Sequence, residues 1–196
     1  EVKLNNISFS NDKKIVIIGG INVIESEELA MQTAEVYKNI AIKHNLEIIF
    51  KASYDKANRS SIHSFRGPGI KRGLKVLEKI KNTFQLPVIS DVHSPQEALE
   101  ASQVLDIIQL PAFLARQTDL VKALALTKKI INIKKPQFLS PHQAQNIINK
   151  FIEYGNNKLL ICERGTNFGY DNLVVDMLGF GLIKKECSNI PLIFDV

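Results

Sequence analysis

The sequence predicts an α/β fold: a (β/α)8 TIM barrel whose last unit or units lie outside the chain, with residues 1–196 forming one domain. Three observations support this. Short β-branched apolar runs alternate with helical patterns, which indicates a parallel sheet buried on both faces. The runs recur roughly every 20 to 40 residues, as barrel strands do. Finally, Gly19-Gly20 leads into Ile-Asn-Val-Ile-Glu rather than a glycine-rich phosphate turn, which disfavours the alternative, a doubly wound open sheet.

The elements follow in order from the apolar runs and the breaks between them. Residues 2–9 alternate weakly and end at a turn signal, which predicts a short strand or hairpin arm. The barrel strands are expected at residues 15–19, 47–50, 87–91, 107–110, 130–134, 159–162 and 191–195. The helices are expected at residues 26–44, 71–83, 95–102, 118–127, 141–154 and 171–185. Because an open barrel would expose strand edges, we expect the protein to continue past Val196.

Bulk properties exclude several classes of protein. A hydrophobic content of 45% is typical of a globular chain, and no apolar run approaches the roughly 20 residues of a membrane helix. The net charge of +5 is mild, and no aromatic residues interleave with a basic face, which argues against a nucleic-acid partner. The two cysteines, Cys162 and Cys187, cannot build a disulfide framework, so a cytoplasmic location fits best. Cys162 lies within a predicted strand and is expected to be a small buried residue.

The most unusual segment is the long polar stretch over residues 50–69. It follows an apolar strand, ends in Gly-Pro-Gly, and carries four cations, namely Lys51, Lys56, Arg59 and Arg66. A solvated surface loop is one interpretation. The other is an anion site, most simply for phosphate, because arginine supplies paired hydrogen bonds and lysine a point charge.

Polar residues also follow every predicted strand of the barrel. In order these are Asn22 and Glu25, Lys51 and Ser53, Asp91 and His93, Gln109, Lys134 and Lys135, Glu163 and Arg164, and Asp195. The carboxyl ends of barrel strands carry the active site in enzymes of this fold. A ring this polar would be costly to bury unless its groups pair or bind a ligand. Its many cations predict a polyanionic ligand that carries phosphate.

Four segments resemble the 3-deoxy-D-manno-octulosonate 8-phosphate synthases, the 2-dehydro-3-deoxyphosphooctonate aldolases. They are residues 50–69, 109–119, 134–138 and 164–170, in that order along the chain. The resemblance implies condensation of phosphoenolpyruvate with D-arabinose 5-phosphate and water, which supplies lipopolysaccharide synthesis. The related DAHP synthases, which use erythrose 4-phosphate, remain an alternative, although their lysine-proline-arginine-threonine motif is absent. A basic module that binds nucleic acid or other anions is the non-enzymatic alternative.

The resemblance also implies roles for individual residues. Phosphoenolpyruvate would be bound by Lys51, Ser53, Lys56, Lys134 and Arg164, and the pentose phosphate by Asn58, Arg59 and Ser60. Gln109 is a further substrate-binding candidate. Phe113 and Arg116 match positions that reach a neighbouring subunit's site, so a homotetramer is implied. The catalytic candidates are Lys134, Asn22, Lys56 and Asp91, with Lys134 as proton donor or electrostatic stabiliser.

Asn22 bears on the need for a metal. Metal-dependent members of the resembled family carry a cysteine at this position, and a neutral amide is a much poorer transition-metal ligand than a thiolate. We therefore expect the metal-independent class, with no cofactor. The family's remaining metal ligands, a His, a Glu and an Asp, would lie beyond Val196.

Overall fold

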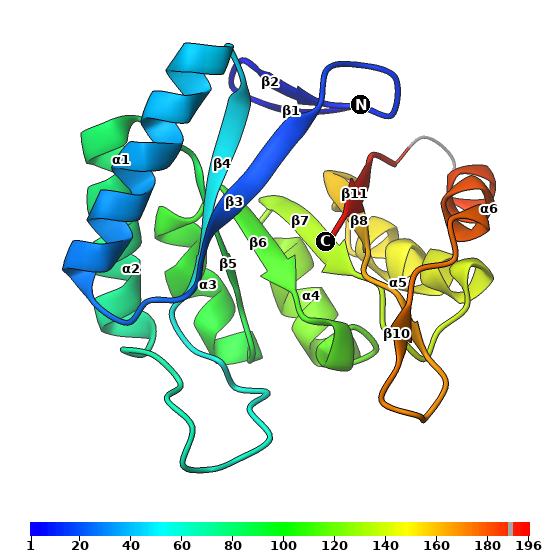
Figure 1. Cartoon of the computed structure of the whole chain (residues 1–196). Helices are drawn as coiled ribbons and strands as arrows, with labels where there is room; N and C mark the ends of the chain where they lie inside the picture. Colours follow the sequence, from blue (N-terminus) through cyan, green and yellow to red (C-terminus); the bar gives the residue numbers. More distant parts are fainter. Residues whose placement is uncertain (188–189) are drawn as a thin grey trace.

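A computed structural model describes residues 1–187 and 190–196. Its centre is one curled sheet of seven parallel strands in the order β11-β8-β7-β6-β5-β4-β3 (Figure 1). The strands are β3 (Val16–Val23), β4 (Glu47–Ser53), β5 (Val88–Asp91), β6 (Ile107–Leu110), β7 (Ile130–Lys134), β8 (Leu159–Glu163) and β11 (Leu192–Phe194). Neighbours in the sheet are also successive barrel strands in the sequence, so the predicted α/β barrel wall is confirmed.

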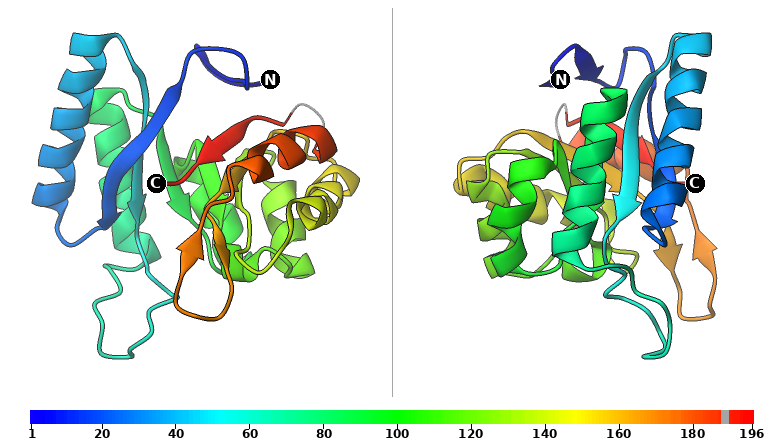
Figure 2. Two further views of the ribbon diagram at one scale, coloured as in Figure 1. Left: turned by 45° about the vertical axis from the view of Figure 1, so that its right-hand side comes forward. Right: turned by 90° about the vertical axis from the view of Figure 1, so that its left-hand side faces the viewer.

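The helices cover the outer face of this wall. They are α1 (Glu27–His44), α2 (Ile70–Phe84), α3 (Pro95–Val104), α4 (Thr118–Leu126), α5 (Pro141–Glu153) and α6 (Leu178–Glu186), with a short 3-10 turn, η1 (Ala112–Leu114). Figure 2 shows α1 and α2 side by side next to β3 and β4. The outward strand residues, such as Phe50, Val88 and Ile131, belong to the same buried cluster as the apolar residues of the helices.

The inward faces of the strands have a different composition. Ile49, Ile89, Ile107, Ile130 and Leu160 form a second apolar cluster inside the curled sheet. Since side chains alternate along a strand, the next inward position is two residues further on. On β4, β5, β6 and β7 that position holds Lys51, Asp91, Gln109 and Asn132. The interior therefore changes from apolar to polar toward the carboxyl ends of the strands.

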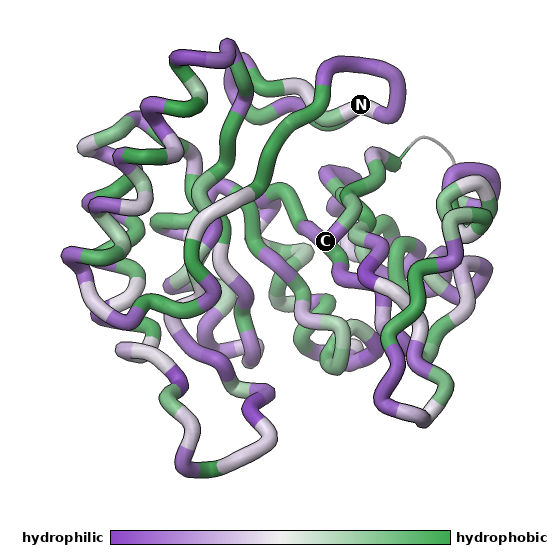
Figure 3. The backbone as a smooth tube through the Cα atoms, in the orientation of Figure 1, coloured by the Kyte–Doolittle hydropathy of each residue, from purple (hydrophilic) through white to green (hydrophobic). Residues whose placement is uncertain are grey.

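An antiparallel hairpin closes the apolar end. It consists of β1 (Val2–Leu4) and β2 (Ile7–Phe9), joined through Asn5, whose φ of 50° lies in the left-handed region. Val2 and Phe9 pack into the inner apolar cluster. The hairpin lies near the amino ends of β3 and β4, opposite the loop that follows β4 (Figure 1). Figure 3 shows this change in hydropathy along the sheet: β3 begins in a hydrophobic segment, whereas the loop after β4 is mostly hydrophilic or neutral.

The first two barrel strands are longer than expected, because β3 runs on to Val23 and β4 to Ser53, so Asn22, Lys51 and Ser53 lie within strands rather than after them. The helix expected at residues 171–185 starts later than predicted. It begins at Leu178, and a hairpin of β9 (Thr166–Asn167) and β10 (Leu173–Val174) precedes it. Gly169 and Asp171 both adopt positive φ, at 88° and 57°, which turns the chain back and prevents a helix from starting there. The other helices lie close to their expected bounds.

Candidate active site

The carboxyl ends of the strands open into a cavity of about 410 Å³. Its lining comes from β5, β6, β7 and the loops after β4, β5, β6, β7 and β8. The polar and aromatic residues in that lining are Lys56, Asn58, Asp91, His93, Gln109, Phe113, Lys134, Gln137 and Arg164. Seven of these were predicted as site residues, so distant segments of the sequence meet here as the barrel prediction required.

Asp91 anchors the inner wall of this cavity. Its Oδ1 accepts hydrogen bonds from the Ser53 hydroxyl and from Lys51 Nζ, the latter at 3.3 Å, and Lys51 also donates to Ser53 Oγ at 3.1 Å. Burial alone raises the pKa of Asp91, but the charge of Lys51 and the bonds from His93 and Ser53 outweigh it and hold that pKa well below its usual range. Asp91 is therefore a carboxylate at neutral pH, and it fixes two predicted phosphoenolpyruvate ligands.

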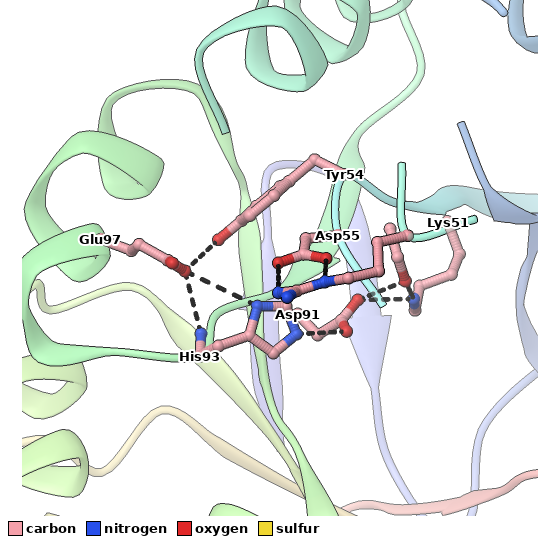
Figure 4. Close-up of polar contacts among 8 residues, drawn as sticks. Lys51, Tyr54, Asp55, Asp91, His93 and Glu97 are labelled. Atoms are coloured by element: carbon pink, nitrogen blue, oxygen red, sulfur yellow. Dashed lines mark hydrogen bonds and ion pairs between the residues drawn. The ribbon is translucent and has the colours of Figure 1, made fainter. Parts of the chain in front are cut away.

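His93 holds the other oxygen of Asp91. Its Nε2 lies 2.9 Å from Asp91 Oδ2 (Figure 4). Glu97 Oε2 accepts hydrogen bonds from the His93 backbone N–H at 3.0 Å and from the Tyr54 hydroxyl at 2.8 Å. Burial lowers the pKa of His93, but Asp91 and Glu97 outweigh it and raise that pKa to about 9. The sequence predicted His93 at this strand end, whereas no motif or spacing in the sequence indicated a role for Tyr54 or Glu97.

Several cations of the predicted ring are paired within the protein. Lys134 Nζ forms an ion pair with Asp195. Lys135 is 1% exposed, lies 3.5 Å from Glu163 Oε1, and donates to the carbonyls of Pro136, Leu139 and Gly165. Lys135 thus ties the loop after β7 to the loop after β8 and does not line the cavity.

One cation of the polar loop is also structural. Arg66 makes two hydrogen bonds to the Asp55 carboxylate, and its carbonyl accepts from Lys56 N–H at 2.7 Å. Gly67 follows with a φ of 124°, and a Cβ there would lie 2.5 Å from the Tyr54 carbonyl. These contacts hold the start and end of the polar loop together, so Arg66 serves the loop's shape.

Three cations of the predicted ring and loop remain without a carboxylate partner among residues 1–187 and 190–196: Lys56, Arg59 and Arg164. The Arg164 Nε is buried and lacks a hydrogen-bond partner in the same residues. Burial, together with the charges of Lys51, Lys134 and Arg59, lowers the pKa of Lys56. An anion in this cavity would supply the counter-charge that Lys56 and Arg164 lack, and a hydrogen-bond acceptor for the buried Arg164 Nε.

Other predicted residues lie away from the main cavity. Arg59 lines a more open hollow of about 540 Å³ with Val23 and Phe65, beside the end of β3. Arg116 lines a small hollow of about 130 Å³ between the chain after η1 and α5, and its carbonyl accepts from Lys150. Asn22 is exposed at an irregularity in the pairing of β3 with β4, and Ser60 is exposed near the loop tip.

Three further observations concern the described residues. Cys162 is buried, as expected, and burial raises the pKa of its thiol to about 12, so it is not a nucleophile at neutral pH. Within residues 1–187 and 190–196, no three His, Cys, Asp or Glu side chains gather closely enough to hold a metal ion. None of the helices in this part of the chain has the length and apolarity to span a membrane.

Comparison with known proteins places the chain in a family. The model of the DAHP synthetase I family matches residues 1–196. The 2-dehydro-3-deoxyphosphooctonate aldolase of Parasynechococcus marenigrum (strain WH8102) is 61% identical over 196 residues, covering 100% of this chain and 69% of the relative. The proteins of that name from Klebsiella pneumoniae and Haemophilus influenzae are each 56% identical over 195 residues, with the same shares covered. The chain therefore belongs to the DAHP synthetase I family, among the 2-dehydro-3-deoxyphosphooctonate aldolases.

Proposed function

We propose that this protein condenses phosphoenolpyruvate with D-arabinose 5-phosphate and water, giving 3-deoxy-D-manno-octulosonate 8-phosphate and inorganic phosphate for lipopolysaccharide synthesis. The observation that carries the proposal is the full-chain identity of 56% to 62% with proteins named for this product. The cavity supports it on independent grounds. One substrate carries a phosphate and a carboxylate and the other a phosphate, and the cavity wall offers cations that no carboxylate of the described residues neutralises.

Phosphoenolpyruvate would occupy the inner part of the cavity. Lys51 and Ser53 stand on β4 beside Asp91, and Lys56, Lys134 and Arg164 line the space above them. The unpartnered Nε of Arg164 would donate to a phosphate or carboxylate oxygen. Gln109, at the end of β6, adds an amide that can bond either group.

The pentose phosphate would bind toward the polar loop. Asn58 lines the main cavity, while Arg59 lines the separate hollow beside the end of β3, with Ser64 and Phe65. Ser60 follows directly in the loop. We assign the phosphate of the aldehyde substrate to this outer region, because the region lies away from the inner cations. The two phosphates are then kept apart, and the aldehyde carbon is directed inward.

The chemistry follows from where charge develops. Water adds its oxygen to C2 of the enol phosphate, while C3 forms a bond to the aldehyde carbon. The C2 hemiketal phosphate then expels inorganic phosphate to leave the keto group. Of the two protons of the added water, one leaves with the phosphate and the other balances the proton that the aldehyde oxygen takes up. Lys134 is the proposed proton donor or stabiliser of that oxygen, Lys56 stabilises phosphate charge, and Asp91 orients Lys51 and Ser53.

We further propose that the reaction needs no metal. The argument is the amide of Asn22 at the position where metal-dependent members of the family carry a thiolate. In this proposal Asn22, at the end of β3, orients substrate or water by hydrogen bonds.

We also propose a cytoplasmic location for this protein.

The proposed assembly is a homotetramer. Phe113 lines the cavity yet is 55% exposed, and Arg116 turns away from the cavity to a hollow against α5. A neighbouring subunit could cover these two residues and bring its own copies to the adjoining site. Sedimentation velocity at micromolar concentration measures this directly, and a monomer under assay conditions would contradict it.

The test of the proposed function is a phosphate-release assay with the full-length protein. Phosphoenolpyruvate with arabinose 5-phosphate should release phosphate, with unchanged turnover in EDTA. Because the matching family model is that of the DAHP synthetases, the parallel arm uses erythrose 4-phosphate. Preference for that aldehyde would transfer the proposal to DAHP synthesis, and loss of turnover in EDTA would overturn the metal-independent assignment.

A further inference from the structure

A layer of residues behind the cavity connects α3 to the Asp91 carboxylate. Glu97 Oε2, on the first turn of α3, accepts from the Tyr54 hydroxyl at 2.8 Å and from His93 N–H at 3.0 Å. His93 Nδ1 lies 3.7 Å from the same oxygen, too far for a normal hydrogen bond but close enough for strong attraction. His93 Nε2 reaches Asp91 at 2.9 Å (Figure 4).

Tyr54 is held firmly by its surroundings. It is 1% exposed, and its ring meets the His93 ring edge-on, with centroids 6.0 Å apart. A Cβ at Gly73 of α2 would lie 2.2 Å from Tyr54 Cβ. Glycine at this position lets α2 pack directly against Tyr54, which places its hydroxyl on Glu97 rather than in the cavity.

We propose that Glu97 and Tyr54 are positioning residues for the condensation: they fix His93, and His93 fixes the Asp91 carboxylate against Lys51 and Ser53. The inference rests on the proposed function. Neither residue lines the cavity, so both act through His93 rather than on substrate. Each contact in this series, from Tyr54 and Glu97 through His93 to Asp91, is charged or charge-assisted. Such contacts hold the side chains at fixed positions.

The groups facing His93 favour its protonated form. Asp91 comes from β5 and Glu97 from α3, while Tyr54 contributes a neutral hydroxyl whose pKa burial and Glu97 raise further. Asp55, in the loop after β4, is paired with Arg66, so these two charges largely cancel. Cations are also present. Lys56, Lys134 and Arg164 line the cavity together with His93, and Lys51 of β4 pairs with Asp91.

The test compares Glu97→Gln with Glu100→Gln on the same helix. In Glu97→Gln the side chain keeps an oxygen for Tyr54 and His93 N–H but loses its charge, whereas Glu100 is exposed and makes no side-chain hydrogen bond in the described residues. Glu97→Gln should lower kcat about tenfold or more with less than a threefold change in KM. It should also lower the His93 pKa, followed by NMR, by at least one unit, while Glu100→Gln changes neither.

A double-mutant cycle adds Tyr54→Phe, which removes only the hydroxyl. Tyr54→Phe should lower kcat several-fold in the wild-type background and have no further effect on Glu97→Gln, because Tyr54 acts through Glu97. If Glu97→Gln does not fold, Tyr54→Phe alone becomes the decisive variant. The test therefore does not depend on one substitution. Values of kcat and His93 pKa matching those of Glu100→Gln would overturn the proposal. The NMR titration needs no turnover, so an inactive wild-type protein would overturn the proposed function separately.

Discussion

Nε2 of His93 and Oδ2 of Asp91 lie 2.9 Å apart, and this contact joins the outer helix layer to the cavity. Asp91 uses its other oxygen for Lys51 and Ser53. One carboxylate thus neutralises two cations and aligns two predicted substrate ligands.

Replacing Asp91 with Asn should impair both folding and turnover. The substitution leaves Lys51 and His93 without their shared counter-charge at sites that are mostly buried. We expect a loss of about 3 kcal/mol in the free energy of unfolding and a fall in kcat on the order of 10²-fold or more. Urea unfolding and the phosphate-release assay measure the two effects. Asp119→Asn, on the exposed first turn of α4, is the control, and equal behaviour of the two variants would contradict the assigned role.

Stability should fall as the pH rises from about 6.5 to 9. His93 has a pKa of about 9 in the folded protein and about 6.5 when unfolded, so its proton is bound more tightly by the folded state. Its contribution is complete below pH 6.5 and is lost as the pH passes through 9, at most about 3 kcal/mol. Unfolding free energies at pH 6, 7.5 and 9 measure the loss.

The matched variants for this pH dependence are His93→Gln and His142→Gln. His142 is 60% exposed in its side chain and should leave the profile as in the wild-type protein. His93→Gln should flatten it. A profile that is equally steep in both variants would show that another group titrates.

The adjacent lysines Lys134 and Lys135 should differ in what their loss affects. Lys134→Ala should lower kcat roughly 10²–10³-fold, about 3–4 kcal/mol in the barrier, with little loss of stability, because its partner Asp195 is 42% exposed in its side chain. Lys75→Ala, on the exposed side of α2, controls for removal of a lysine. A loss under tenfold for Lys134→Ala would remove Lys134 from the mechanism.

Lys135→Met should instead act mainly on stability. It leaves the Glu163 carboxylate and three carbonyl groups buried without their cation. We expect a loss of about 3 kcal/mol or more in the free energy of unfolding. Chemical denaturation of this variant beside Lys134→Ala makes the comparison, and a stability equal to wild type would refute the structural role.

The sequence allowed most of the barrel wall to be predicted, because each strand is a short apolar run and each carboxyl end is polar. The inward side chains of Lys51, Asp91, Gln109 and Lys134 follow from alternation along those strands. Such patterns are local, so they can be recognised without knowing which segments meet in the folded chain.

What the sequence did not reveal was which charges satisfy one another. Lys135 and Arg66 looked like ligand-binding cations, but their partners lie 28 and 11 residues away along the chain, at Glu163 and Asp55. Glu97 lies in the first turn of α3, where acidic residues are common, so its position alone does not distinguish it. Its contact with Tyr54 depends on the packing of α2 and α3, which no periodicity encodes.

The most direct measurement of the central claim is phosphate released from phosphoenolpyruvate by the full-length protein, with and without arabinose 5-phosphate. The account predicts release that requires the pentose phosphate and matches formation of the eight-carbon sugar acid phosphate one to one. Release without an aldehyde substrate, or no release with arabinose 5-phosphate present, would contradict it.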